Sequence, residues 1–476
     1  MNSRFGGMFH SNTSPFLIRD TLLYAKGHRF ILFVGICGTG MSALARFLHK
    51  KGHFVVGYDS TKSGEYDRIV SSGIVIFNSM DEIDFSKIAL IVYSLAIPQG
   101  HPLIREDIPN CSRAELLGSV MLDYPIRIAV AGTHGKSTVT SLLHRALTAL
   151  GEKPTTMSGA DLGDGNGPLA IGDSKVFLYE CCEYKNSFLY THPTHALLLN
   201  LDHDHTDFFP TIHEVKTSFL RFAELSEKVW YFASDDGLSS IQAQMPSHAH
   251  PYYLYDEYPE KIDTPPPFGV KMRGEGKGGY TFYKSETESI SLTPTILGDV
   301  GIFNTLAALT LLSDLGYDIT SSAKILERLP PIARRIELLG RIGNAPLYYD
   351  FAHHPTEIRE TISTLAKRYG KAPVVVFAPH TYTRTRDLWD GFVMALSLAT
   401  LVFLCPITPA RESPIPHVTS ENLVRLLPVG SRVVCTAEDV IEQLPLTDAP
   451  IVLMGAGELT KIQKELMEMQ TFIPIS

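Results

Sequence analysis

A short glycine-containing stretch has the residue types needed to hold the phosphates of a nucleotide. It comprises Gly132, Thr133, His134, Gly135, Lys136, Ser137 and Thr138. Glycine lets backbone N–H groups close around phosphate oxygens, and a helix that starts here adds partial positive charge. Lys136 would reach the β- and γ-phosphates, and the Ser137 hydroxyl would bind Mg²⁺. These residues predict a nucleotide-phosphate loop.

The flanking sequence predicts a strand before this loop and a helix after it. An apolar run over 126–131 is short enough for a buried strand, and from residue 136 onward the apolar residues recur at helical spacing. The strict pattern G-x-x-x-x-G-K-[ST] is not met, because Val130 stands where its first glycine belongs. The alternative interpretation is an ordinary turn followed by a helix cap.

Acidic and imidazole side chains follow two further predicted strands. The strand over 176–179 ends in Glu180, and a polar segment follows the strand over 196–199. That segment contains Asp202, His203, Asp204, His205 and Asp207. Ligands of open α/β sheets bind beyond the carboxyl ends of the strands, so these residues are candidates for a ligand site. The alternative is a loop whose aspartates cap a helix.

A second glycine-rich turn lies near the N-terminus, between a predicted strand over 29–34 and a predicted helix over 41–51. Its candidate binding residues are Gly35, Gly38, Thr39, Gly40, Met41 and Ser42, with Asp59 after the next strand. The spacing is G-x-x-G-x-G and not G-x-G-x-x-G, so the turn favours a nucleotide diphosphate without indicating NAD. Tight packing of a strand against a helix is the alternative.

The last third of the chain has histidines and arginines after its predicted strands. The polar residues are Asp350, His353, His354, His380, Arg384, Arg386, Arg411 and Glu412. An arginine at a helix start is usually solvated. Because three strand ends converge on such residues, we interpret them as a site for a small anionic group.

Strand and helix patterns alternate along the chain, which predicts an α/β fold. At 476 residues the chain is too long for one core and suggests about three domains. We place their boundaries to give 1–124, 125–331 and 332–476. Residues 234–293 lack strong periodicity and predict irregular structure or short antiparallel strands. The predicted helices include 304–315, 355–369 and 383–399.

Composition excludes several classes of protein. The net charge is −9, which gives no electrostatic case for binding nucleic acid or an anionic membrane. The six cysteines show no C-x-x-C pair and no zinc spacing, so we expect reduced thiols in a cytoplasmic protein. The N-terminal segment is too polar for a signal peptide, and no apolar run approaches the ~18 residues of a membrane span.

Taken in order, the motifs resemble those of the Mur ligases of peptidoglycan synthesis over nearly the whole chain. They are GICGTGMSALA at 35–45, SRAELLG at 112–118, AGTHGKST at 131–138, ECCEYKNSFL at 180–189, NLDHDHTDFF at 200–209, RRIELLG at 334–340, DFAHHPTEI at 350–358, PHTYTRTRDL at 379–388, PARESP at 409–414 and GAGE at 455–458. Each motif alone is modest, whereas DxxHHPTE followed by PHxYTRTRDL is specific.

The resemblance implies three domains: an N-terminal Rossmann-like domain that binds UDP, a central P-loop-type ATPase domain and a C-terminal Rossmann-like domain with an amino-acid pocket. UDP on the first glycine turn argues against NAD and against an oxidoreductase. The implied reaction uses ATP to convert the carboxylate of UDP-N-acetylmuramate into an acyl phosphate, which the amine of L-alanine attacks. The implied partners are these small molecules, with no nucleic acid or membrane, in a monomer or homodimer.

The resemblance also assigns roles to residues. It implies Lys136, Asp350, His353 and Arg384 as catalytic groups, and His380, Arg384 and Arg386 as the amino-acid pocket. It adds Asn304 and Arg335 to the ATP-binding loop residues, and it makes Ser137, Glu180 and His205 ligands of Mg²⁺. A histidine ligand would also suit Mn²⁺. Either His353 or His380 could take the proton from the amine.

Three departures from the family pattern leave alternatives open. Val300 and Gly301 stand where relatives carry His and Asn, Phe351-Ala352 replaces Tyr-Gly, and Thr381 occupies a position that is often Arg. A related ligase that adds a peptide to the same sugar nucleotide would need a more open amino-acid pocket. A non-catalytic homologue that binds only the UDP-sugar would explain the change at Val300-Gly301. The retained Lys136 and metal residues favour an active enzyme.

Overall fold

The structure is a computed structural model that describes most of the chain. The described residues are 15–62, 64–98, 100–163, 167–255, 269–272, 280–285, 288–330, 332–410, 412–444, 447–456, 459–469 and 471–474. The chain forms two compact units. The first comprises Met1–Gly132, Val139–Asn200 and Lys216–Pro251, and the second comprises Thr133–Thr138, Leu201–Val215 and Tyr252–Ser476.

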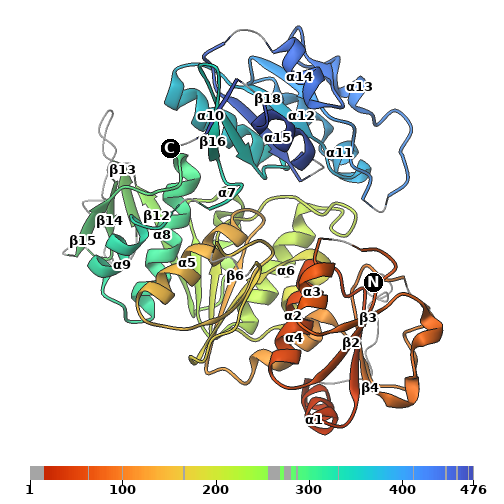
Figure 1. The fold of residues 1–476 in the computed structure, drawn as a ribbon. Helices are drawn as coiled ribbons and strands as arrows, with labels where there is room; N and C mark the ends of the chain where they lie inside the picture. Colours follow the sequence, from red (N-terminus) through yellow and green to blue (C-terminus); the bar gives the residue numbers. More distant parts are fainter. Residues whose placement is uncertain are drawn as a thin grey trace. The chain divides into compact units, whose positions relative to one another are not determined.

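The first unit contains a parallel five-stranded sheet with the order β3-β2-β1-β4-β5, drawn in red and orange in Figure 1. Its strands are β1 (Phe30–Val34), β2 (Phe54–Tyr58), β3 (Val75–Phe77), β4 (Ile88–Tyr93) and β5 (Asn110–Ser112). The accompanying helices are α1 (Pro15–Ala25), α2 (Thr39–Lys50), α3 (Tyr66–Ser71) and α4 (Arg113–Met121), with 3₁₀ turns η1 (Met80–Glu82) and η2 (Phe85–Lys87). Every residue of β4 is buried, as expected for a parallel strand covered on both faces.

A second run of strands in the first unit has the order β11-β10-β6-β9-β7-β8. The strands are β6 (Ile126–Ala131), β7 (Thr155–Met157), β8 (Leu169–Ala170), β9 (Val176–Cys181), β10 (His195–Leu198) and β11 (Val229–Phe232). Neighbours are parallel except β7 and β8. Val130 lies opposite Glu180, and Ala131 lies opposite Leu198. The loops after β6, β9 and β10 therefore begin at the same edge of the sheet.

The helices of the middle part of the chain follow these strands. They are α5 (Lys136–Ala149), α6 (Ile212–Leu225) and α7 (Asp236–Ser239), with 3₁₀ turns η3 (Tyr184–Tyr190) and η4 (Gln242–Gln244). Residues of α5 and α6 belong to both units. The helix predicted from residue 136 onward is confirmed.

Four strands in the order β12-β13-β14-β15 and two helices come next, and all of them lie in the second unit except the first three residues of β12. They are β12 (Ala249–Tyr255), β13 (Gly269–Met272), β14 (Tyr280–Tyr283), β15 (Ser289–Leu292), α8 (Gly298–Asp314) and α9 (Ile319–Leu326). The strands β13, β14 and β15 pair antiparallel, which confirms the predicted short antiparallel strands for the described residues. The parallel pairing of β12 with β13 was not predicted.

The second unit also contains a seven-stranded sheet with the order β20-β19-β18-β21-β17-β16-β22. Its strands are β16 (Glu337–Ile342), β17 (Ala345–Asp350), β18 (Val374–Ala378), β19 (Leu401–Leu404), β20 (Arg432–Val433), β21 (Ile451–Gly455) and β22 (Phe472–Pro474). Its helices are α10 (Pro355–Tyr369), α11 (Tyr382–Asp387), α12 (Trp389–Leu396), α13 (Ser420–Val424), α14 (Ala437–Gln443) and α15 (Thr460–Met467). The strands from β20 to β17 are parallel, and β16 is antiparallel to both of its neighbours.

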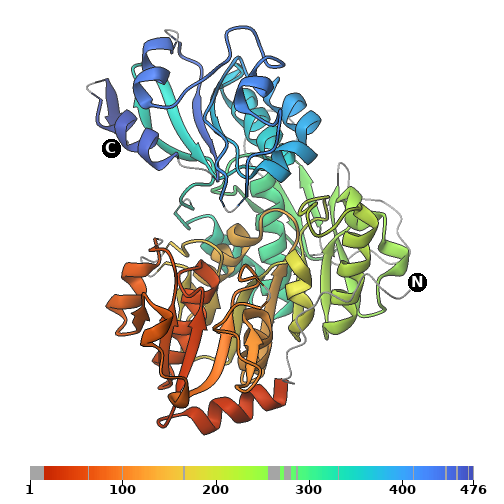
Figure 2. The same cartoon turned by 90° about the vertical axis from the view of Figure 1, so that its right-hand side faces the viewer.

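Helices cover both faces of this seven-stranded sheet, as Figure 2 shows. On one face Tyr348 and Phe377 pack with Phe392 of α12 and with α10. On the other face Leu347 and Val376 pack with α14 and α15. Successive strand residues point to opposite faces, so these apolar strands are buried on both sides. The predicted α/β fold class is confirmed.

Two of the helices predicted above differ from those observed by more than two residues. The helix predicted over 304–315 begins six residues earlier, at Gly298, because packing against α9 and α10 outweighs the low helix propensity of two glycines. The single helix predicted over 383–399 is wrong, since the chain breaks at Leu388 (φ −108°, ψ 22°) into α11 and α12. The two parts make different contacts: polar residues of α11 bind the loop over 201–211, whereas α12 buries its apolar side on the sheet.

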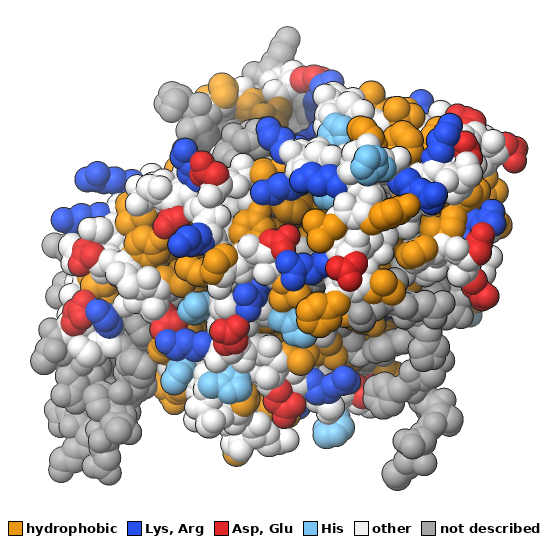
Figure 3. Space-filling view, turned by 90° about the horizontal axis from the view of Figure 1, so that it is seen from below, with side chains coloured by type: hydrophobic (Ala, Val, Ile, Leu, Met, Phe, Trp, Pro, Cys, Tyr) orange, Lys and Arg blue, Asp and Glu red, His pale blue; other side chains and the backbone are white. Residues whose placement is uncertain are grey.

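Three residues of the family motifs, Arg411, Gly457 and Glu458, lie outside the described residues. Among the described residues no helix has both the length and the apolar character needed to cross a membrane. All six cysteines are described, and none of them forms a disulfide. Figure 3 shows one face of the molecule, on which Lys and Arg side chains are interspersed with Asp and Glu.

Candidate active site

The predicted phosphate loop leaves β6 and leads directly into α5. Gly132 has a φ of 144° and Gly135 a φ of 80°, values that glycine adopts without strain. A Cβ on Gly132 would lie 3.1 Å from Leu199 Cβ, so the backbone passes close to the end of β10. Lys136 Nζ donates a hydrogen bond to the Thr133 carbonyl oxygen at 3.0 Å. Strand, glycine turn, Lys-Ser and helix start therefore occur as predicted.

The segment after β10 is tied to the phosphate loop. The Asp202 N–H donates to Thr133 Oγ1 at 2.9 Å. The Asp202 carboxylate accepts from Thr356 Oγ1 at 2.7 Å. The Asp204 carboxylate accepts from Nε and Nη2 of Arg384, both at 3.2 Å. These aspartates therefore bind side chains of α10 and α11, contrary to the alternative in which they cap a helix.

His134 of the phosphate loop lies between two carboxylates. Its Nδ1 is 3.1 Å from Glu357 Oε1, and its Nε2 is 3.3 Å from Asp202 Oδ2. Burial alone would lower the pKa of His134, but the Asp202 and Glu357 carboxylates raise it to about 9. At neutral pH His134 is an imidazolium that donates to both carboxylates.

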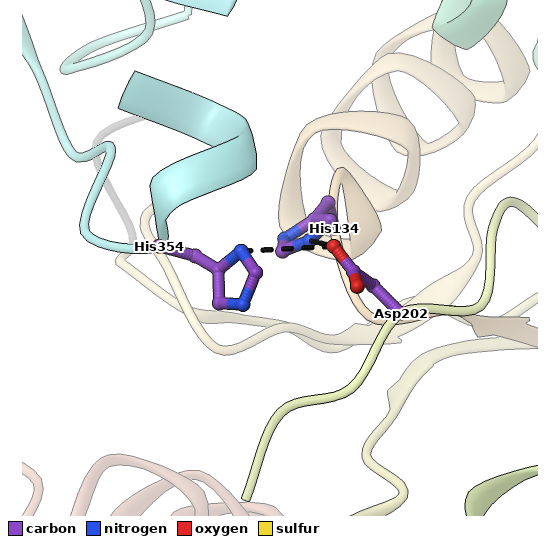
Figure 4. A group of neighbouring side chains, drawn as sticks. All are labelled: His134, Asp202 and His354. Atoms are coloured by element: carbon purple, nitrogen blue, oxygen red, sulfur yellow. Dashed lines mark hydrogen bonds and ion pairs between the residues drawn. The ribbon is translucent and has the colours of Figure 1, made fainter. Parts of the chain in front are cut away.

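The ring of His354 packs beside His134, and Figure 4 shows both imidazoles turned toward the Asp202 carboxylate. Their ring centroids are 4.7 Å apart. Burial and the nearby His134 charge lower the pKa of His354 to about 4, so this ring is neutral. One ligand atom from each of the three residues lies within 4.8 Å of the others, a spacing that could hold a metal ion. Because His354 Nδ1 accepts the Thr356 N–H and caps α10, we interpret the group as a hydrogen-bonded network.

Two further predicted catalytic residues lie at the end of β17. Asp350 is 5% exposed and accepts from Thr361 Oγ1 at 2.5 Å. Burial raises the pKa of Asp350 to about 6. His353 Nδ1 lies 3.1 Å from the Phe351 carbonyl oxygen and donates to it, which leaves Nε2 as the acceptor. Burial lowers the pKa of His353, so its ring is neutral and able to accept a proton.

The predicted amino-acid pocket follows β18. His380 pairs in a parallel bridge with Thr408, and its buried Nδ1 has no hydrogen-bond partner among the described residues. Arg384 is bound to Asp204, and the exposed Arg386 is bound to Asp387 at 2.6 Å. His380 thus lies in the loop just before α11, and Arg384 lies in α11 itself. Arg386 is also in α11, but its side chain binds the adjacent Asp387.

The two additional ATP-binding candidates lie on separate elements of the second unit. Asn304 is 5% exposed in α8, and its Nδ2 has no partner among the described residues. Arg335 stacks over the Phe351 ring, 5.7 Å from its centroid, and its charge acts on Asp350 and Glu357. A buried amide that lacks a partner is a reasonable contact for a ligand.

The backbone at the start of α8, around Val300-Gly301, packs closely against its neighbours. A Cβ on Gly301 would lie 2.0 Å from the Ile296 carbonyl oxygen. A Cβ on Gly298, which has a φ of 78°, would lie 2.2 Å from Thr364 Oγ1. A side chain at residue 301, where the family pattern has Asn, would therefore require the first turn of α8 to shift.

We expect Gly301→Ala to lower the midpoint of thermal unfolding, because the added methyl group must displace the backbone at Ile296. Overpacking of this kind costs about 1–3 kcal/mol. Differential scanning calorimetry measures the effect. Gly64→Ala is the matched control, since a Cβ there meets nothing within 4 Å. Equal midpoints for the two variants would contradict the close approach.

The predicted metal ligands are divided between the two units. Glu180 lies in the first unit, and Ser137 and His205 lie in the second. The Glu180 carboxylate accepts from the Gly159 N–H at 2.7 Å and from Ser158 Oγ at 3.3 Å. A Cβ on residue 159 would lie 2.7 Å from Glu180 Oε1, so a glycine is needed beside this carboxylate. Carboxylate and hydroxyl oxygens are ligands that Mg²⁺ prefers, and an imidazole nitrogen would also suit Mn²⁺, so each group by itself has the chemistry of a metal ligand.

The first glycine turn connects β1 to α2, as predicted. Gly35 has a φ of 79°. Asp59 accepts the Cys37 N–H at 2.9 Å, so its carboxylate holds the turn in shape. Ser42 donates to Glu65 at 2.9 Å. Gly40 borders a cavity of about 220 Å³ whose other lining residues are Ala43, Leu44, Arg113, Leu117, Met157, Ser158, Gly159, Glu180 and Cys182.

Sequence reasoning did not single out two residues of these sites. Glu357 binds His134, and Arg113 lines the cavity beside Gly40 and Glu180. Glu357 carried a detectable signal, because a glutamate three residues after an N-cap, with proline between them, is typical of a capping box. Arg113 directly follows the N-cap of α4 and carried no comparable signal.

Models of three protein domains match the chain in sequence order. The Mur ligase family catalytic domain matches residues 30–125, the Mur ligase middle domain matches 130–312, and the Mur ligase glutamate ligase domain matches 334–457.

Individual relatives match over nearly the whole length. A UDP-N-acetylmuramate–L-alanine ligase of Agathobacter rectalis is 32% identical over 455 residues, which cover 92% of this chain and 97% of the relative. One of Clostridium tetani is 33% identical over 456 residues, covering 93% and 98%. The crystal structure of UDP-N-acetylmuramate-alanine ligase from Thermotoga maritima shares the fold, with a TM-score of 0.73 at 22% identity, over 93% of this chain and 99% of that one. A murein peptide ligase from Psychrobacter arcticus has a TM-score of 0.67 at 20% identity, over 92% and 98%. By its three domains and its full-length relatives, this chain belongs to the Mur ligase family.

Proposed function

We propose that this chain is an ATP-dependent ligase that joins L-alanine to UDP-N-acetylmuramate. The observation that carries the proposal is the identity of 32–33% to relatives of that name over more than nine-tenths of the chain. The phosphate loop and the histidine and arginine side chains gathered in the second unit supply groups suited to this chemistry.

The first step transfers the γ-phosphoryl group of ATP to the muramate carboxylate. Both reactants are anions, so the site must offset negative charge and hold them in line. Lys136 and the loop N–H groups would do this for the phosphates. Ser137, Glu180 and His205 would hold Mg²⁺ or Mn²⁺, which supplies further charge stabilisation. Asn304 and Arg335 are proposed contacts of the nucleotide, and the turn from Gly35 to Ser42 is the proposed UDP site.

The second step requires an amine without its extra proton and an oriented alanine carboxylate. His353 is suited to take the proton, since its Nδ1 is bound to a carbonyl and burial keeps the ring neutral. His380 is the second candidate. Arg384 can pair a carboxylate through two N–H groups. Because Arg384 is bound to Asp204 in this structure, alanine would share or displace that aspartate.

The proposal extends to the organisation of the protein. We propose three domains over 1–124, 125–331 and 332–476, a cytoplasmic location and a monomer or homodimer. The location follows from the substrates, since ATP and UDP-linked sugars are available inside the cell.

The experiment that tests the function is phosphate release from ATP with UDP-N-acetylmuramate, Mg²⁺ and each amino acid in turn. We expect release with L-alanine and a new amide in the mass spectrum of the product. A muramyl-type tripeptide is the contrasting acceptor, and release with it alone would assign the chain to peptide addition. A sample that binds the sugar nucleotide but releases no phosphate with any acceptor would be a non-catalytic homologue.

A further inference from the structure

His134 lies where three segments of the second unit meet. It belongs to the phosphate loop, Asp202 to the segment after β10, and Glu357 to the first turn of α10. The side chains of His134 and Glu357 are each 15% exposed. Proposed catalytic residues or metal ligands lie in or next to each of these segments: Lys136 and Ser137, His205, and Asp350 and His353. A contact that joins all three segments can fix these groups relative to one another.

The two carboxylate oxygens of Glu357 have different hydrogen-bond partners. Oε1 faces His134 Nδ1 at 3.1 Å. Oε2 accepts the N–H groups of His353 and His354 at 3.0 and 3.3 Å. The same carboxylate therefore shapes the backbone that carries His353 and holds the phosphate loop. Thr356, in the same turn, binds Asp202 and adds a second connection.

Resting on the function proposed above, we propose that His134 and Glu357 are positioning residues of the ligase. The ion pair between them sets the distance between the phosphate loop and the start of α10, and hence between Lys136 and His353. The substrate class that depends on the pair is ATP, because Lys136 would contact its phosphates. UDP-sugar binding, at the first glycine turn, is independent of the pair.

The charges around His134 favour its protonated form. Asp202 and Glu357 face it directly, and the ring beside it is the neutral His354. Burial would raise the pKa of Glu357, but the hydrogen bond from the His134 imidazolium and the charges of His134 and Arg335 hold it well below its usual range. The pKa of His134 is raised, so the ion pair is complete at neutral pH and is lost as the pH rises past about 9.

Glu357→Gln tests the proposal, because glutamine keeps the size and one acceptor but removes the charge. We expect kcat/KM for ATP to fall about 10- to 100-fold, the scale of a small misplacement in an active site. The KM for UDP-N-acetylmuramate should change less than about twofold. Glu360→Gln is the matched control on the same helix, since the Glu360 carboxylate pairs only loosely with Arg359, at 3.7 Å. The double variant with His134→Gln should be no more impaired than the more impaired of the two single variants, because both changes remove the same contact between His134 and Glu357.

A second measurement separates positioning from a loss of fold. Binding of a fluorescent ATP analogue is followed from pH 7 to 10 without L-alanine, so that the ammonium of the amino acid does not contribute. We expect wild-type binding to weaken around pH 9, and Glu357→Gln to weaken at a lower pH. Unchanged ATP binding and kcat in a folded Glu357→Gln protein would overturn the proposal. If wild type binds the analogue but forms no amide with alanine, the proposed function fails while the binding measurement still tests the pair.

Discussion

Lys136→Ala is expected to reduce turnover about 10³-fold or more, while UDP-N-acetylmuramate still binds. Lys136 starts α5 directly after Gly135, so its ammonium is the first cation that the phosphates of a bound ATP would meet. In this structure the ammonium donates a hydrogen bond to the Thr133 carbonyl oxygen of the same loop. Removing a preorganised donor from a phosphoryl-transfer site costs on the order of 10²–10³ in rate, and here a full charge is lost as well.

Phosphate release measures the activity of Lys136→Ala, and isothermal titration calorimetry measures its binding of the UDP-sugar. Lys153→Ala is the control, because the Lys153 side chain is 73% exposed and lies 3.9 Å from Asp173. We expect the control to retain wild-type turnover. Full phosphate release by Lys136→Ala would exclude the phosphate-transfer mechanism. Loss of both phosphate release and UDP-sugar binding would indicate a folding defect.

The sequence was sufficient for features that depend on local pattern. The strand-turn-helix layout around Lys136 follows from an apolar run, two glycines and helical spacing, and the structure has it. The helix over 355–369 was predicted to the residue, because Pro355 at its start and Gly370 after its end are strong signals. Buried parallel strands such as β6 were recognisable as short apolar runs.

Tertiary contacts decided the features that the sequence did not predict. Gly298 and Gly301 disfavour a helix locally, yet α8 begins there because the backbone packs against Ile296 and Thr364. The break at Leu388 could not be predicted, since the apolar and polar residues on either side continue the same helical spacing. The strand β16 was also not predicted. Its register shifts between Leu338 and Gly340, within the motif RRIELLG, so its residues do not alternate regularly between apolar and polar.

The candidate site shows the same division. Motifs identified the phosphate-loop, Asp202 and His353 segments separately, but a motif does not say which residues meet. The pairing of His134 with Glu357 joins positions 223 residues apart, and only the fold brings them together. Arg384 was predicted to bind a substrate carboxylate, and in this structure its partner is Asp204, an aspartate of the predicted ligand-site segment.

Glu180→Gln is expected to give the second-largest loss, about 100-fold or more in turnover at low Mg²⁺, with a higher Mg²⁺ concentration needed for half-maximal rate. Glutamine keeps an oxygen that can accept from the Gly159 N–H and Ser158 Oγ, so the local structure should persist. It removes the negative charge, which a hard divalent cation requires from its ligands. The loss should therefore fall on the metal-dependent step and leave folding unchanged.

Phosphate release as a function of Mg²⁺ concentration measures this effect, and electron paramagnetic resonance of Mn²⁺ measures binding without turnover. Glu224→Gln is the control, because Glu224 is an exposed carboxylate of α6 in the same unit. Gly159 N–H and Ser158 Oγ hold the Glu180 carboxylate in place. If Glu180 had only this structural role, Glu180→Gln would lower the midpoint of thermal unfolding and leave the dependence of rate on Mg²⁺ concentration unchanged. A shifted curve with an unchanged midpoint would instead assign Glu180 to the metal, because only the charge of the side chain has been removed.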